Sequence, residues 1–140
     1  MLPPVHINWL AVLGATAANM AVGGLWYGPL LGKKWMKAMG MDPNMPMTPE
    51  KKKAGNKAIV MMVPLAFLSA LVLAYFISYE HARTAWDGLV TGFWTWAGFQ
   101  MTLLLQERIF ENKKMELLYI NGSYQLVAIC LQAVIIAVWA

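Results

Sequence analysis

Four carboxamide side chains interrupt otherwise apolar stretches of this sequence: Asn19, Gln100, Gln125 and Gln132. An amide donates and accepts hydrogen bonds but does not titrate, so its chemistry suits a neutral partner better than an ion or a proton. At about 1.5 Å of helical rise per residue, Asn19, Gln100 and Gln125 come out at similar depth. The spacing predicts one polar layer. Two interpretations stay open: hydrogen bonds that fix neighbouring helices, or a small polar cavity for a ligand or solute.

The sequence has few residues that could support catalysis or metal binding. Cys130 is the single cysteine, which excludes an internal disulfide framework and a cysteine-based zinc site. His6 and His81 are far apart and lack the close spacing of a metal site. No acid–base pair or activated nucleophile is visible. We therefore expect no catalytic residue, no metal and no cofactor, and a protein that is not an enzyme.

The composition indicates that helices in a lipid bilayer position these amides. The chain is 59% hydrophobic and 13% charged, against roughly 25% charged in soluble domains. A helix needs about 20 apolar residues to cross a bilayer. The stretches that qualify are 5–31, 58–79, 86–105 and 117–139, none with a charged residue in its interior, which disfavours ion-coupled transport. We predict a single all-α domain over residues 1–140, a bundle of four transmembrane helices.

The basic residues predict an orientation, because cytoplasmic loops carry excess lysine and arginine. Loop 32–57 holds seven and loop 106–116 holds three, which makes ten of the eleven in the chain. Both loops should face the cytoplasm and both termini the other side. No basic residue precedes the first apolar stretch, so residues 1–31 are expected to be a retained span rather than a signal peptide. The lysines flank membrane ends without a folded basic module, so no nucleic-acid partner is expected.

Local signals mark helix ends. Gly28-Pro29 should loosen or kink the last turn of the first span. Thr48, Pro49 and Glu50 predict a helix start that continues into the second span.

Stripes of small residues predict where helices approach closely. In the first span the stripe is Gly14, Ala17, Ala18, Ala21, Gly24 and Gly28. In the third it is Gly88, Thr91, Gly92, Thr95, Gly98 and Thr102, and Gln100 projects away from it. We expect each stripe to pack against a neighbour, so that leucine at Gly24 or Gly92 would loosen the fold.

Several motifs resemble a known family. "INWLAVL" at residues 7–13, "GGLWYGPLLGKKWMKAMG" at 23–40 and "IFENKKMELLYINGSYQLVAI" at 109–129 are similar to a bacterial and fungal membrane family, domain of unknown function 1761. The resemblance covers nearly the whole chain. It implies a four-span integral membrane protein, which in bacteria would lie in the cytoplasmic membrane. It implies no reaction. Its recurring residues are matched here by Asn8, Trp9, Gly24, Trp26, Tyr27, Pro29, Trp35, Asn121 and Tyr124.

Five of these motif residues fall in the cytoplasmic half and could meet in space: Trp26, Tyr27, Pro29, Asn121 and Tyr124. Whether they form a site or a packing joint stays open.

The favoured function is a non-catalytic bundle that works through contacts, as a homo-oligomer or as an accessory subunit of a larger membrane complex. Small stripes, paired polar groups and the lipid bilayer suffice for it. The alternative is a small carrier or binding protein for a neutral solute or lipid, which would use the Asn/Gln layer.

Overall fold

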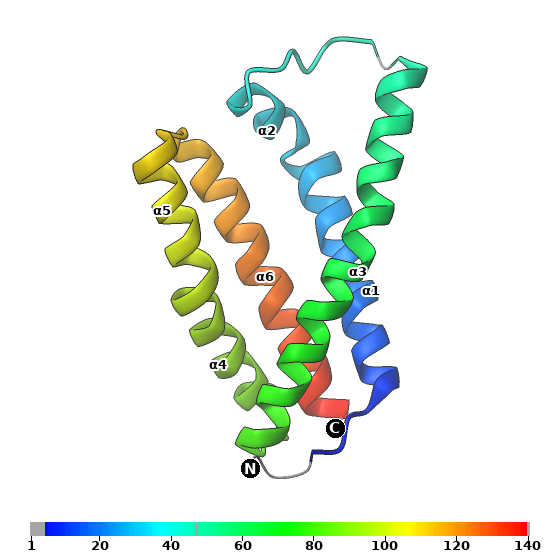
Figure 1. The fold of residues 1–140 in the computed structure, drawn as a ribbon, viewed down its shortest axis with the longest axis vertical. Helices are drawn as coiled ribbons and strands as arrows, with labels where there is room; N and C mark the ends of the chain where they lie inside the picture. The colour runs from blue at the N-terminus through cyan, green and yellow to red at the C-terminus, as the bar shows by residue number, and fades with distance from the viewer. Residues whose placement is uncertain (1–4, 47, 140) are drawn as a thin grey trace.

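The computed structural model describes residues 5–46 and 48–139, and that part of the chain is all-helical, with no strand (Figure 1). The two elements labelled η are π-helical turns, wider than an α-helical turn. In chain order the elements are α1 (Trp9–Leu25), η1 (Trp26–Leu30), α2 (Gly32–Ala38), α3 (Pro49–Glu80), α4 (Ala85–Thr95), η2 (Trp96–Gln100), α5 (Met101–Glu111) and α6 (Met115–Trp139).

Three helical stretches within the described residues are long and apolar enough to cross a membrane: Trp9–Leu30, Pro49–Glu80 and Met115–Trp139. They correspond to the first, second and fourth predicted spans. The stretch predicted as the third span, 86–105, is also helical, but it is divided among α4, η2 and α5 and does not reach the same combination of length and hydropathy. The protein is therefore an all-helical protein of membrane type.

The first helix of the described residues begins inside the predicted first span, 5–31. The helix begins at Trp9 because Asn8 has extended backbone angles and acts as its N-cap. The Asn8 side-chain oxygen accepts hydrogen bonds from the backbone N–H groups of Leu10 (3.2 Å) and Ala11 (3.3 Å). Such a cap satisfies donors that the first helical turn cannot pair internally.

Both predicted loops contain helix, of which only the start of α3 at Thr48 and Pro49 was expected. Loop 32–57 contains α2 and the first turns of α3, and most of loop 106–116 belongs to α5 and α6. The residue that ends α5 is Asn112, in the left-handed conformation with φ 54°, a common helix stop for asparagine. A helix can continue past the apolar stretch because its backbone hydrogen bonds are made internally in water and lipid alike.

The two local predictions are confirmed. The Thr48 hydroxyl caps α3 by accepting from the Lys51 N–H at 3.2 Å, with Pro49 in the first turn, and α3 runs without a break through the second span. Gly28 leaves helical backbone angles (φ −107°, ψ −107°) beside Pro29, so the chain is kinked in η1.

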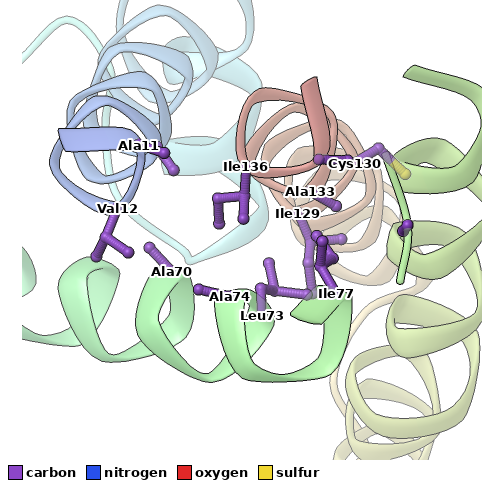
Figure 2. Close-up of a cluster of buried hydrophobic side chains, with 13 residues drawn as sticks. Ala11, Val12, Ala70, Leu73, Ala74, Ile77, Ile129, Cys130, Ala133 and Ile136 are labelled. Atoms are coloured by element: carbon purple, nitrogen blue, oxygen red, sulfur yellow. The ribbon is translucent and has the colours of Figure 1, made fainter. Parts of the chain in front are cut away.

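Helix α6 is the centre of the packing and touches α1, α3 and α4. Figure 2 shows small and branched side chains of α1, α3 and α6 meeting in one buried cluster. The cluster lies toward the end of the molecule that carries both termini in Figure 1. The buried residues of α3 run from Ala66 to Ile77, whereas its N-terminal half is exposed. The helices are therefore packed together at one end of the molecule, whereas at the other end their side chains are more exposed.

The stripe prediction is right for the first half of the third stretch. A Cβ on Gly92 would lie 2.8 Å from the Cα of Cys130, and one on Gly88 would lie 2.7 Å from the carbonyl oxygen of Ala133. Only glycine allows α4 to approach the α6 backbone this closely. Past η2, however, Gly98 and Thr102 are exposed.

Within one chain the prediction for the first span fails for most of the stripe: a Cβ on Gly14 would lie 3.1 Å from the Trp139 ring, but Ala17, Ala21, Gly24 and Gly28 are exposed. Helix α1 buries Ala11, Val12, Ala15 and Thr16 instead of its small stripe. A Cβ on Gly24 would meet nothing within 4 Å, so no close helix approach within one copy requires glycine at this position. Ala11, Val12 and Ala15 belong to the buried cluster that α1 shares with α3 and α6, and their side chains bury more apolar surface than glycine would.

Candidate functional site

All four predicted amides line one cavity of about 160 Å³. It lies where α1, α3, η2 and α6 face one another, beside the buried cluster. Residues from each of these elements form its wall: Asn19, Met62, Leu65, Ala66, Ser69, Gln100, Tyr124, Gln125, Ala128, Ile129 and Gln132. The structure therefore brings the four amides of the predicted polar layer to one lined space.

Two of the amides are held by the protein itself. Gln132 is completely buried; its Nε2 donates to the backbone oxygens of Ala15 and Ala66 (both 3.3 Å), and its Oε1 accepts from the Ser69 hydroxyl at 3.2 Å. Asn19 accepts at Oδ1 from the Tyr124 hydroxyl at 2.9 Å. Gln132 thus connects α6 with α1 and α3, and Asn19 connects α1 with α6, as in the helix-fixing interpretation.

The other two amides differ. The side-chain oxygens Oε1 of Gln100 and Gln125 are buried, and neither has a hydrogen-bond partner among the described residues. A buried acceptor without a donor costs several kcal/mol in an apolar environment, by an estimate of about 2–7. Both oxygens belong to residues that line the same cavity. These two acceptors favour the cavity interpretation, because a bound donor would satisfy them.

The position of Gln100 follows from η2. Residues Trp96–Gln100 form a π-helical turn, which holds more residues than an α-helical turn and shifts the faces of all that follows. A prediction that assumes the regular α-helical rotation of 100° per residue therefore places Gln100 and the end of the small stripe on the wrong faces. The shift brings Gln100 to the cavity and leaves Gly98 exposed.

Four motif residues that we expected to meet do meet, between η1 and α6. The Tyr27 hydroxyl donates to Asn121 Oδ1 at 2.6 Å, and Trp26 Nε1 donates to the Ser123 hydroxyl at 3.2 Å. The rings of Tyr27 and Tyr124 pack edge to face with centroids 5.2 Å apart. We call Trp26, Tyr27, Asn121 and Tyr124 the aromatic joint.

The remaining motif residues have other positions. Trp35 packs its ring edge to face on Tyr27 at 5.7 Å. Asn8 donates from Nδ2 to the Trp139 carbonyl at 2.8 Å, joining the start of α1 to the end of α6. Trp9 is 56% exposed, and Gly24 and Pro29 are exposed as well. Pro29 is thus not part of the joint, contrary to our expectation.

A second cavity, of about 440 Å³ and mostly apolar, adjoins the first. The two share Met62 and Tyr124 in their walls. Residues of α1 and η1 and side chains of α3 complete it: Met20, Gly23, Gly24, Tyr27, Gly28, Ala58 and Ile59. Tyr124 therefore stands between an apolar space and an amide-lined space.

Sequence reasoning missed three contributors. Ser69 pairs with Gln132, Ser123 pairs with Trp26, and Trp96 donates from Nε1 to the Gly122 carbonyl at 2.9 Å. Single serines in apolar helices are common and usually bond their own backbone. The available signal was the placement of Ser69 at about the depth of the amides.

The lining of the amide cavity defines its chemistry. The wall offers amide and hydroxyl groups and apolar carbons, without a carboxylate, an imidazole or an ammonium group. Such a wall can hold a neutral molecule by hydrogen bonds and contacts, and it has no group for proton abstraction.

The fold and this cavity define a class: all-helical proteins of membrane type with an amide-lined cavity between helices. The chain belongs to the family described as protein of unknown function (DUF1761), whose model matches residues 10–137. The resemblance read from the motifs is thereby confirmed. Comparison with curated proteins and with solved structures gives no match.

Proposed function

We propose that this protein is a four-span membrane protein that binds a small neutral molecule in its amide cavity, without catalysing a reaction on it. One observation carries the proposal: the side-chain oxygens of Gln100 and Gln125 are buried without a donor among the described residues, and both residues line the same cavity. In a bilayer such groups are costly to leave unpaired. The ligand should therefore bring at least one N–H or O–H donor, and a ligand with two could satisfy both oxygens.

The size of the cavity limits the ligand. An engineered cavity of about 150 Å³ in another protein holds benzene, and this one measures about 160 Å³. Molecules of the size of glycerol, urea or acetamide fit this limit. The apolar remainder of the wall, such as Leu65 and Ile129, favours uncharged molecules because an ion would lose its hydration without gaining a counter-charge.

The membrane arrangement belongs to the same proposal. The helical path of residues 85–111 would be the third crossing, with α1, α3 and α6 as the others. The ten basic residues of loops 32–57 and 106–116 support a cytoplasmic position for both loops and an outer position for both termini. The location proposed with it is the one expected from the sequence, the bacterial cytoplasmic membrane.

The test is thermal unfolding in lipid nanodiscs with a matched pair of probes, N-methylacetamide and N,N-dimethylacetamide. They differ by one methyl group, and only the first has an N–H. We expect glycerol, urea and N-methylacetamide to raise the melting temperature and the dimethyl compound to have no effect. Each of Gln100→Leu and Gln125→Leu should weaken binding about fivefold, the value of one hydrogen bond of about 1 kcal/mol. Equal stabilisation by both probes, or none by any donor, would overturn the proposal.

A second candidate is the contact function, as a homo-oligomer or accessory subunit. The specific observation is the small stripe of α1, where Ala17, Ala21, Gly24 and Gly28 are exposed and a Cβ on either glycine would meet nothing within 4 Å among the described residues. Another helix could approach this face closely. Crosslinking in native membranes tests it: Gly24→Leu should abolish a crosslinked partner or dimer without lowering the stability of the single chain.

A further inference from the structure

An open groove of about 690 Å³ lies between α2 and the first turns of α6, apart from the amide cavity. Its floor is apolar and aromatic and its rim is charged. The residues that line it are Leu31, Lys34, Lys37, Glu116, Tyr119, Ile120 and Ser123. In Figure 1 this is the end of the molecule opposite the two termini.

The rim carries charges of both signs. Lys34 and Lys37 are three residues apart on α2 and so project from the same face. Glu116 lies in the first turn of α6. Ion pairs found within residues 5–46 and 48–139 join Lys113 to Glu107 and to Glu111. In that part of the chain neither groove lysine is paired with Glu116, so all three charges are free for an occupant.

The occupant must match this arrangement. Two ammonium groups side by side suit a phosphate, and a carboxylate across the groove suits an ammonium group with N–H donors. The apolar floor suits a glycerol backbone and the start of acyl chains. Trp26 and Trp35 near the groove are of the type that marks the headgroup level of a bilayer.

We propose that this groove binds a phospholipid with a zwitterionic headgroup that carries a primary ammonium, of the phosphatidylethanolamine class. The phosphate lies at Lys34 and Lys37, and the ammonium donates to Glu116. Phosphatidylglycerol would satisfy the lysines but bring only hydroxyl groups to the carboxylate. Phosphatidylcholine would bring a quaternary ammonium, which has no N–H. The site depends on the membrane setting and is independent of the amide cavity.

The experiment is native mass spectrometry of the protein released from nanodiscs that contain equal amounts of phosphatidylethanolamine, phosphatidylglycerol and phosphatidylcholine. Exposed ion pairs contribute about 0.2–1 kcal/mol each, so we expect the ethanolamine lipid to be enriched about threefold over each of the others. Glu116→Gln should reduce the preference over phosphatidylglycerol to parity. Lys34→Gln combined with Lys37→Gln should reduce retention of all three lipids.

Matched controls lie close by. Lys33→Gln removes a lysine from the same helix that does not line the groove, and Glu111→Gln removes a carboxylate from the neighbouring helix end. Neither should change the lipid ratios. Helix content and melting temperature confirm that each variant is folded. Preference of the wild type for phosphatidylglycerol, or an ethanolamine preference that survives Glu116→Gln, would overturn the proposal. Loss of ligand binding in Gln100→Leu with unchanged lipid ratios separates this site from the amide cavity.

Discussion

The hydroxyl of Tyr27 donates a 2.6 Å hydrogen bond to Oδ1 of Asn121, although the two residues lie 94 positions apart in the chain. The bond closes the kinked turn η1 onto α6, and the ring of Tyr124 packs against Tyr27 beside it. Tyr124 in turn donates to Asn19 at the wall of the amide cavity. The aromatic joint and the cavity are thus connected through one tyrosine.

The Tyr27–Asn121 bond should be measurable as a coupling energy. Hydrogen bonds between membrane helices average about 0.6 kcal/mol, with a maximum near 1.7. We expect a double-mutant cycle of Tyr27→Phe and Asn121→Leu, followed by unfolding in mixed micelles, to give a coupling in this range. Tyr75→Phe is the control, because the described residues give Tyr75 no side-chain hydrogen bond. Additive effects of Tyr27→Phe and Asn121→Leu would show that the bond does not contribute.

The glycines of α4 and η2 offer a second comparison. Gly92→Ala should destabilise by about 1–3 kcal/mol, because its Cβ would press on the α6 backbone at Cys130. Gly98→Ala meets nothing within 4 Å and should leave stability unchanged or raise it by up to about 1 kcal/mol through helix propensity. Both are measured by thermal unfolding. Equal effects of the two substitutions would contradict the close α4–α6 approach.

The glutamines should separate into two kinds. Gln132→Leu removes three hydrogen bonds from a fully buried side chain and should cost about 1–2 kcal/mol. Gln100→Leu and Gln125→Leu remove acceptors that have no partner, so the ligand-free protein should be as stable as before or more so. Unfolding without added ligand tests the contrast. A large destabilisation by Gln100→Leu would mean that its amide is structural.

The start of α1 provides a test with graded variants. Asn8→Ala loses the N-cap and the bond to the Trp139 carbonyl, and should cost about 1–2 kcal/mol. Asn8→Asp keeps the capping oxygen but loses the Nδ2 donor, so its cost should be smaller. The free energy of unfolding decides the order, and an aspartate variant less stable than the alanine variant would exclude the capping role.

Much of this could be predicted from the sequence, for identifiable reasons. The amide layer was predictable because Asn19, Gln125 and Gln132 lie in regular helices, where rise and rotation per residue are fixed. Thr48 could be predicted as a cap because its signal is local. The positions of Tyr27 and Asn121 in their spans also indicated that both lie in the cytoplasmic half and could meet, although not that they are bonded.

Other features depend on partners that the sequence does not display. Helix α1 has two faces that could pack closely against a neighbour. Only the shapes of α3 and α6 decide that the face with Val12 is buried and the face with Gly24 is not. Helix α2 is short and begins at a kink, without a side-chain cap to signal it. The π-helical turn η2 changes the phase of everything after it, so the orientation of Gln100 and Gly98 could not be predicted from a regular helix.

The most direct test of the ligand-binding account is native mass spectrometry of the protein released gently from its own membrane. The account predicts a retained neutral molecule of about the size of glycerol on the wild type, lost from the Gln100→Leu/Gln125→Leu double variant and kept by Gln106→Leu, whose residue is exposed. A wild-type protein that carries no such molecule, or carries it equally well after both cavity glutamines are replaced, would contradict the account.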